Sequence, residues 1–233
     1  MSITENLAVV RLRIETATRR VGRRPDEVAL MAVSKTQPAQ RIREAYDAGQ
    51  RLFGENRVQE FAAKFDPLQG LRDAKWHMIG HLQTNKAAKA AEVFSAVDSV
   101  DSLKLAEKLD AATRQLGKRL DVLIEINVGG EAAKSGLAPE SSELEELLLA
   151  APKLESLRFR GLMNVPPFTE DPEGARPYFR KLRALREAIT ARHLPAMNLD
   201  QLSMGMSHDF EIAIEEGSTC VRVGTAIFGE RMR

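Results

Sequence analysis

Short β-rich segments alternate with helix-forming segments along the whole of this 233-residue chain. Strict alternation is typical of parallel βα units, because two neighbouring parallel strands need a crossover connection. Dividing 233 residues by eight units gives roughly 29 residues for each, close to the unit of a compact (β/α)8 TIM barrel. We therefore predict an α/β fold in which a single barrel domain covers residues 1–233. The predicted strands are 28–33, 51–53, 76–79, 96–100, 122–127, 158–163, 201–204 and 219–223.

An open, doubly wound sheet is the competing fold for this pattern. That fold usually carries a glycine-rich turn after its first strand, whereas residues 34–36 read SKT here. Between the predicted strands, segments such as 102–116 and 175–192 keep one apolar face at helical spacing. No linker or low-complexity segment divides the chain, so the barrel is favoured over two smaller domains.

The N-terminal segment places Leu7, Val10 and Ile14 at helical spacing and lacks the continuous apolar region of a signal peptide. We expect an amphipathic helix that covers the barrel wall where an eighth crossover helix normally sits. Glu5 and Glu15 disfavour a mitochondrial leader. No apolar run approaches the length that spans a bilayer, so we expect a cytoplasmic protein with no membrane partner.

Composition narrows the partners and the chemistry. The 34 basic and 33 acidic residues leave a net charge of +1, so no overall field attracts nucleic acid or an anionic membrane. Hydrophobic residues at 43% and charged residues at 29% are typical of a folded globular protein. The single cysteine, Cys220, excludes an intrachain disulfide and a cysteine-rich zinc site, and we expect it in the core.

Lys35 lies two residues after the end of the first predicted strand, whose residues 28–33 are all apolar. The carboxyl ends of the strands build the functional site of a barrel, which draws attention to this amine. Lysines are rarely buried, so one interpretation is a side chain that extends into solvent. The other is an amine whose pKa is lowered by desolvation and which forms a Schiff base with a carbonyl compound.

Residues after the seventh and eighth strands are typical of a phosphate site. Segment 207–217 reads as a helix with Ser207 as its N-cap. Gly224 and Thr225 open a second predicted helix, 225–231. Each pattern alone is explained by helix capping. Helix N-termini also bind anions, however, and these two loops commonly hold phosphate in barrels, so together they favour a phosphate-bearing ligand.

Arg222 lies within the eighth predicted strand, where alternation puts Cys220, Arg222 and Gly224 on one face. An arginine inside a barrel is costly unless it is partnered. One interpretation is a buried ion pair with Glu125 or Asp98, and the other is a ligand contact. A lysine that traps an aldehyde, a phosphate cup and an arginine near a ring nitrogen are the parts of a pyridoxal 5'-phosphate (PLP) site.

The other polar candidates have simple structural interpretations. Asn56 can cap the helix that starts near residue 57, and His81 can be a loop histidine with satisfied hydrogen bonds. Lys134 lies in a glycine-flanked loop and is expected in solvent unless it meets an anion. Met204 and Met206 are expected to pack in the barrel.

At these residues the sequence resembles a known family. The matching stretches are AVSKTQP, FGENRVQE, WHMIGHLQTNK, the KSG at 134–136, GLMNVPP and LSMGMSHDFEIAIEEGSTCVRVGTAIFGER. They run from the first predicted strand to the end of the sequence and resemble the PLP homeostasis proteins, of the YggS/PROSC type. The resemblance implies a barrel similar to the N-terminal domain of alanine racemase, without the second, β domain of that enzyme.

The resemblance also implies PLP as the cofactor and roles for matching positions. Lys35 matches the Schiff-base lysine, and Arg222 matches the arginine that faces the pyridine nitrogen. Ser207, Gly224 and Thr225 match the phosphate cup.

Further positions match residues that line or handle the cofactor in this family. The lining positions are Asn56, His81, Met163 and Met204, and Lys134 matches a lysine implicated in cofactor handling. Gln37 is a departure, because some members have a second lysine there. If that lysine assists PLP transfer, this chain must transfer PLP differently.

Three functions remain open at this point. The first is a PLP carrier, acting in vitamin B6 homeostasis and supply, with no catalytic activity expected and apo PLP-dependent enzymes as candidate recipients. The second is an amino-acid racemase of low activity, which needs a second acid or base opposite the lysine. Only Tyr46 and Tyr178 are tyrosines, and both lie in predicted helices, away from the strand ends. The third is an interaction module with an inert Lys35. Without the racemase β domain, we expect a monomer.

Overall fold

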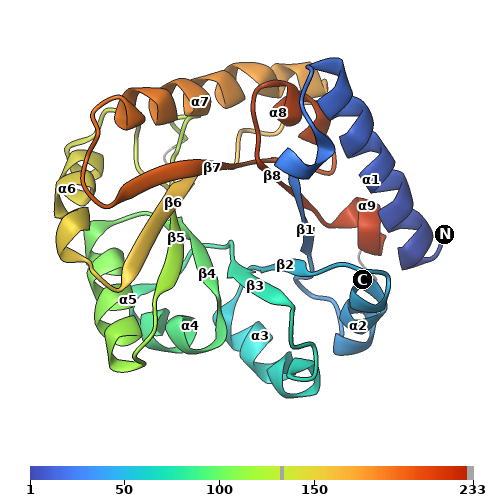
Figure 1. Cartoon of the computed structure of the whole chain (residues 1–233), viewed down its shortest axis with the longest axis horizontal. Helices are drawn as coiled ribbons and strands as arrows, with labels where there is room; N and C mark the ends of the chain where they lie inside the picture. Colours follow the sequence, from blue (N-terminus) through green and yellow to red (C-terminus); the bar gives the residue numbers. More distant parts are fainter. Residues whose placement is uncertain (132–133, 230–233) are drawn as a thin grey trace.

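The computed structural model describes residues 1–131 and 134–229. In this part of the chain, eight strands pair in sequence order, all parallel, and the last pairs with the first to close a barrel (Figure 1). The predicted (β/α)8 barrel is therefore confirmed, and the open sheet is excluded. The strands are β1 (Ala29–Val33), β2 (Leu52–Glu55), β3 (Lys75–Met78), β4 (Ala96–Val100), β5 (Leu120–Glu125), β6 (Leu157–Met163), β7 (Met197–Met206) and β8 (Cys220–Val223).

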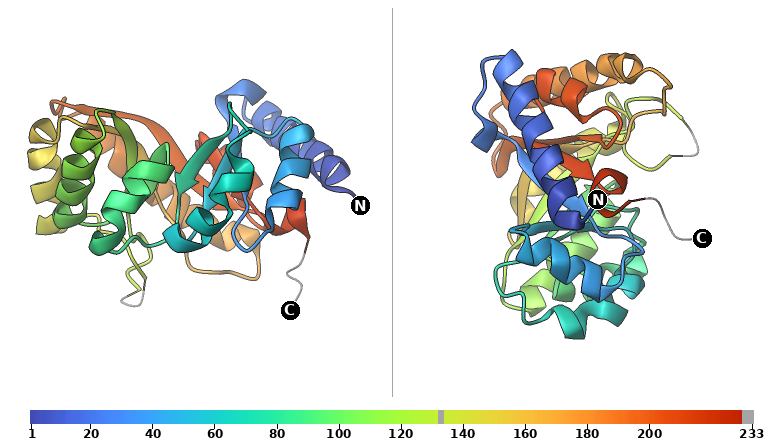
Figure 2. Two further views of the ribbon diagram at one scale, coloured as in Figure 1. Left: turned by 90° about the horizontal axis from the view of Figure 1, so that it is seen from below. Right: turned by 90° about the vertical axis from the view of Figure 1, so that its right-hand side faces the viewer.

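Helices surround the barrel on its outside, as Figures 1 and 2 show. The α-helices are α1 (Ile3–Arg20), α2 (Ala39–Asp47), α3 (Val58–Phe65), α4 (Ala87–Val93), α5 (Leu103–Gln115), α6 (Ser142–Ala150), α7 (Arg176–Thr190), α8 (Phe210–Glu215) and α9 (Thr225–Phe228). Short 3-10 turns are η1 (Pro25–Glu27), η2 (Asp66–Leu68), η3 (Thr84–Lys86), η4 (Ala151–Lys153) and η5 (Pro172–Ala175). No helix in the described ranges combines the length and the apolar character needed to cross a membrane.

Helix α1 closes the ring of helices, as predicted. Its apolar stripe of Leu7, Val10 and Ile14 is buried, and it packs against α2, α8 and α9 (Figures 1 and 2). Asn6 also donates a 2.8 Å hydrogen bond from Nδ2 to the carbonyl oxygen of Ile227 in α9. The first and last helices described thus pack against each other.

The main hydrophobic core is the layer between the barrel wall and the helices. On one side it contains an aromatic group in which Phe53–Trp76, Phe61–Trp76 and Phe61–Phe94 each have ring centroids 4.9 Å apart. This group fixes α3 to β2 and β3. The carboxyl ends of these strands, which carry predicted site residues, are therefore held by rigid packing.

Several predicted boundaries differ from those of the structure, and two of the differences are informative. Strand β7 starts at Met197 rather than at residue 201. The prediction missed its first four residues because they include the exposed Asn198 and Asp200, which break the apolar pattern. The helix predicted at 225–231 is present as α9 but ends at Phe228, before Gly229 with a left-handed φ of 81°. Its predicted residues 230–231 lie outside the described residues.

Candidate functional site

The ends of β1 and β8 lie directly against each other at the carboxyl rim of the barrel. Met31 and Ala32 pair with Arg222 and Val223. A Cβ atom at Gly224 would lie only 3.4 Å from the carbonyl oxygen of Val33. The strand register therefore brings the segment that carries Lys35 beside the segment that opens α9, as a joint lysine and phosphate site requires.

Lys35 is half-buried in a turn of defined geometry. Gln37 donates from its backbone N–H to the carbonyl oxygen of Ser34 at 3.0 Å, which closes the turn around Lys35. Thr36 has a left-handed φ of 63°, which is unusual for a β-branched residue. The backbone on both sides of the lysine is thus restricted.

Ser207 and Gly224 are joined by a hydrogen bond, since the backbone N–H of Gly224 donates to Ser207 Oγ at 3.3 Å. The prediction that Ser207 caps a helix was wrong: α8 starts at Phe210, after Asp209. Asp209 instead accepts from the backbone N–H of Met206 at 2.6 Å, so a tight turn separates strand and helix. This turn leaves the Ser207 hydroxyl beside Gly224, the N-cap of α9, whose first residue is the exposed Thr225.

Arg222 is 3% exposed and points inward, as the alternation predicted. Its guanidinium donates to Ser203 Oγ at 2.7 Å and to the carbonyl oxygen of Asn164 at 2.6 Å. Neither Glu125 nor Asp98, both in the described part, forms an ion pair with it, so the ion-pair interpretation was wrong. Burial lowers the pKa of Arg222, although nearby acidic groups oppose the shift.

Asn56 and His81 lie at the ends of β2 and β3. A Cβ atom at Gly80 would lie 2.4 Å from the carbonyl oxygen of Asn56, so these two loops touch through their backbones. Asn56 does not cap α3, which has no side-chain cap. His81 is 57% exposed and its Nδ1 lies 2.9 Å from Asp101 Oδ2, so the ring stands at the open side of the rim.

The other matched positions differ in how close they come to this rim. Met163 is fully buried and pairs in register with Glu125 and Ser203, so it shares their inward face. Met204 follows Ser203 and lies in the hydrophobic layer between barrel and helices. Lys134 forms an ion pair with Glu131, and its Nζ donates to the carbonyl oxygen of Pro166 at 3.2 Å.

Glu125 and Asn164 are site residues that sequence reasoning did not select. Asn164 is fully buried, and neither polar atom of its amide has a hydrogen-bond partner within the described residues. Glu125 accepts from Ser135 Oγ at 3.1 Å through Oε1, while its buried Oε2 has no partner there. Burial raises the pKa of Glu125. Buried polar atoms without partners are rare in folded proteins, so these two residues are suited to meet a polar ligand. Their only sequence signal is their place at the ends of strands five and six.

A separate hollow of about 670 Å³ opens at the opposite end of the barrel. Its lining includes the first residues of five strands, Ala29, Leu52, Lys75, Ala96 and Cys220. None of the cofactor residues implied by the resemblance lines it. Burial raises the pKa of the Cys220 thiol to about 12, so this cysteine is not a nucleophile near neutral pH, as expected.

The rim therefore offers the primary amine of Lys35, a buried guanidinium, a hydroxyl and backbone amides, together with the unsatisfied buried polar atoms of Glu125 and Asn164. This donor set suits a small anionic ligand with a reactive carbonyl. It does not suit a metal ion, and the described residues contain no cluster of three or more His, Cys, Asp or Glu that could hold one.

Comparison with known proteins gives consistent matches over the full length. The family described as "Alanine racemase, N-terminal domain" matches residues 6–232. The chain is 46% identical to a pyridoxal phosphate homeostasis protein of Aquifex aeolicus, over 99% of both chains. It is 45% identical to one of Escherichia coli K12, over 98% of this chain and 97% of the relative.

Solved structures agree with these matches. The structure of PipY from Synechococcus elongatus with PLP bound has a TM-score of 0.84 at 39% identity, covering 98% of this chain and 100% of PipY. An alanine racemase from Streptomyces coelicolor has a TM-score of 0.69 at 21% identity, covering 97% of this chain and 59% of the racemase. This second likeness concerns the fold alone.

Proposed function

The chain belongs to the alanine racemase N-terminal domain family and, within it, to the pyridoxal phosphate homeostasis proteins, and we propose on that premise that it binds PLP and acts in its intracellular homeostasis and supply. The observation that supports the proposal is the pairing of β1 with β8, which brings the turn after β1 that carries Lys35 beside Gly224 at the end of β8. Gly224 is in turn hydrogen-bonded to Ser207, which follows β7, and Arg222 lies two residues before Gly224. The residues 1–233 would act together as one PLP-binding unit.

The residues at the rim fit the groups of PLP. The aldehyde of PLP supplies a centre that condenses with a primary amine, and Lys35 is the amine that we assign to it. Ser207 Oγ and the backbone of Gly224 and Thr225 would hold the phosphate. The unsatisfied amide of Asn164 gives the interior of this site unused hydrogen-bonding capacity for a polar ring substituent.

The remaining assignments are proposals that the rim geometry supports to different degrees. Asn56 and Met163 would line the cofactor, whereas His81 lies at the open edge of the rim and Met204 in the layer behind the barrel wall. Lys134 is linked to the loop after β6 through Pro166, so its role in cofactor handling would involve that loop.

The buried charge of Arg222 favours a protein that holds the cofactor over an enzyme that uses it for catalysis. A buried cation beside the pyridine nitrogen disfavours protonation of that nitrogen, which weakens the ring as an electron sink. Ser203 and Asn164 hold the guanidinium through neutral oxygens, and no carboxylate among the described residues forms an ion pair with it. We therefore expect no efficient PLP-dependent catalysis.

An amino-acid racemase is the second candidate function, and the His81–Asp101 pair is the observation in its favour, because it places an acid/base group at the rim. Neither tyrosine supplies such an acid/base group at the rim. Tyr46 in α2 donates a hydrogen bond from its hydroxyl to Asp73, and Tyr178 lies in α7. Incubating the PLP-loaded protein with single-enantiomer amino acids distinguishes the two functions. Racemisation well above that of free PLP would favour the racemase.

We also propose a monomer in the cytoplasm that releases PLP to apo PLP-dependent enzymes. Analytical ultracentrifugation tests the monomer. Mixing the PLP-loaded protein with an apo-enzyme, and comparing its reactivation with that by free PLP at equal concentration, tests the release.

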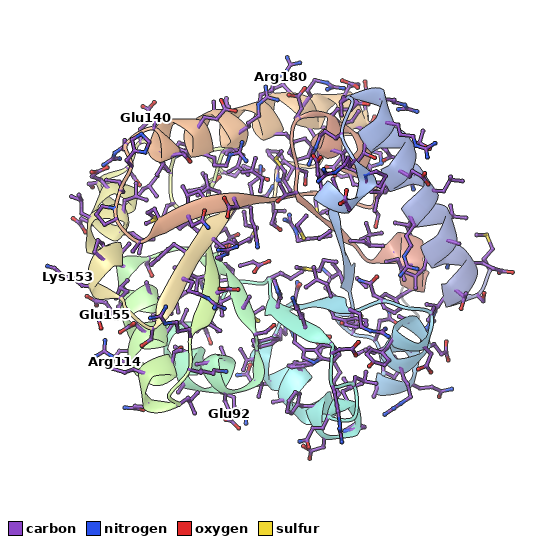
Figure 3. All side chains as sticks on the ribbon, viewed as in Figure 1. Glu92, Arg114, Glu140, Lys153, Glu155 and Arg180 are labelled. Carbon is purple, nitrogen blue, oxygen red and sulfur yellow. The ribbon has the colours of Figure 1, made fainter. Side chains whose placement is uncertain are left out.

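Borohydride trapping tests the central assignment. The protein is mixed with PLP, reduced and digested, and the modified lysine is identified by mass spectrometry. We expect modification at Lys35 and its loss in Lys35→Ala. Lys153→Ala is the matched control, because Lys153 is exposed at the outer edge of the molecule (Figure 3). An adduct that persists unchanged in Lys35→Ala would remove the proposal.

A further inference from the structure

Three residues of α3 and β2 surround the turn that carries Lys35. Lys64, on α3, has a side chain that is only 13% exposed. Its Nζ donates to the carbonyl oxygens of Ser34 at 3.1 Å and Gln37 at 3.2 Å. These two carbonyls stand on either side of Lys35, so a single ammonium group bridges the two ends of the turn.

Glu55 fixes the position of that ammonium group. Its carboxylate is fully buried, and Oε1 lies 3.0 Å from Lys64 Nζ. The same oxygen accepts from Ser34 Oγ at 2.6 Å. Burial raises the pKa of Glu55, whereas the Lys64 charge and the Ser34 hydrogen bond oppose this shift. A buried ion pair is a poor source of net stability, so its presence under this turn calls for another explanation.

The turn itself is strained and needs support from outside. Thr36 has a left-handed φ of 63°, which is unfavourable for a β-branched residue and persists only where the surroundings impose it. Its backbone N–H donates to Glu60 on α3, whose carboxylate also lies 3.5 Å from Lys64 Nζ. Every one of these contacts reaches the turn from α3 or β2.

We propose that Lys64 and Glu55 are positioning residues for the PLP-binding amine, holding the turn at 34–37 so that the Lys35 side chain leaves the end of β1 toward the Ser207–Gly224 pair. The inference rests on the proposed function of Lys35. Without this support the turn would relax, and the amine would reach the aldehyde in a wider range of orientations. A displacement of about 1 Å in a reacting group can reduce its reaction rate on the order of a hundredfold.

The test compares Lys64→Met with wild type. Methionine is apolar and unbranched, with no ammonium group. We expect PLP still to modify Lys35, with an affinity and an attachment rate each lower by about tenfold or more. The induced circular dichroism of bound PLP, which reports the orientation of the ring in the site, should also lose intensity. A general loss of stability would not change this signal per bound PLP.

Two further variants make the result decisive. Ser34→Ala removes one hydroxyl from the same cluster and should shift all three measurements in the same direction by a smaller factor, even if Lys64→Met fails to fold. Lys89→Met is the control, because Lys89 makes an exposed ion pair with Glu92 on α4 and should change nothing.

The outcomes separate the two proposals. If wild type gives no adduct at Lys35, the proposed function fails. If wild type binds PLP, and Lys64→Met and Ser34→Ala match it in affinity, attachment rate and circular dichroism, the positioning role is overturned.

Discussion

Arg222 on β8 donates a 2.6 Å hydrogen bond to the carbonyl oxygen of Asn164, which follows β6, and so reaches across the intervening strand β7. A second donor of the same guanidinium bonds Ser203 on β7 itself. One buried cation thus ties the upper parts of three consecutive strands together.

Replacing Arg222 should therefore affect both stability and cofactor binding. Arg222→Met leaves Ser203 Oγ and the carbonyl oxygen of Asn164 buried without this donor, which we expect to cost about 2 kcal/mol of unfolding free energy. PLP affinity should fall as well. Urea denaturation and a spectroscopic PLP titration measure the two effects. The control Ser203→Ala removes one partner and should cost about 1 kcal/mol. Unchanged stability and affinity in Arg222→Met would contradict this interpretation.

Glu125 should make stability depend on pH in the acidic range. Its pKa is raised by burial above the ordinary value of 4.5, so the unfolded chain loses this proton at lower pH than the native protein does. As pH rises from about 4.5, wild type therefore loses stability that Glu125→Gln keeps. The difference between the two unfolding free energies in cofactor-free protein should grow as pH rises above about 4.5 and should become independent of pH below about 4. Parallel curves would contradict the prediction. Glu140→Gln, at an exposed position, is the control (Figure 3).

Cys220 should not react with thiol-alkylating reagents at pH 8 in the native protein. Its thiol has a pKa of about 12, against 9.0 ordinarily, because it is buried. Iodoacetamide should label it only after unfolding. Between pH 9 and 12 the unfolded chain releases this proton first, so stability falls as pH rises, by up to about 1.4 kcal/mol per unit. Cys220→Ala should remove this part of the slope. Rapid labelling of the native protein would show that the thiolate is accessible.

Position 80 should not accept a side chain, because Gly80 is in close contact with the backbone of Asn56. A Cβ atom at residue 80 would lie 2.4 Å from a backbone oxygen, which cannot move away as a side chain would. Gly80→Ala should cost about 1–3 kcal/mol by overpacking and weaken PLP binding by separating Asn56 from His81. Gly70→Ala, where a Cβ meets nothing within 4 Å, is the matched control. Equal stability of the two variants would contradict the prediction.

The order of the strands, the barrel and the covering role of α1 could all be predicted, because each depends on local apolar patterns that report burial. Arg222 was correctly expected inside the barrel for the same reason. Its hydrogen-bond partners were not predicted. Nothing in the sequence distinguishes Ser203 and Asn164, and only the register of β6, β7 and β8 brings them to the guanidinium. Hydrogen-bond partners depend on tertiary closeness, which periodicity does not encode.

The Lys64–Glu55 pair escaped prediction for a related reason. Lys64 belongs to an amphipathic helix, where a lysine is usually on the solvent face, and Glu55 follows an apolar strand segment. Only the folded chain brings them to 3.0 Å under the Lys35 turn. Likewise, Ser207 looked like a helix cap because serine often is one, and only the Asp209 turn revealed that the helix begins three residues later.

The pairing of β1 with β8, and of α1 with α9, has a consequence for biosynthesis. A ribosome starts the first strand of this sheet 191 residues before the last one, as the separation of the paired residues Ala29 and Cys220 shows. Until β8 emerges, β1 has one unpaired edge, and α1 lacks α8 and α9 as packing partners until the last part of the chain has been made. The nascent chain must therefore keep these surfaces from aggregating during most of its synthesis, and the seam that carries Lys35, Ser207 and Arg222 is the last part of the barrel to form.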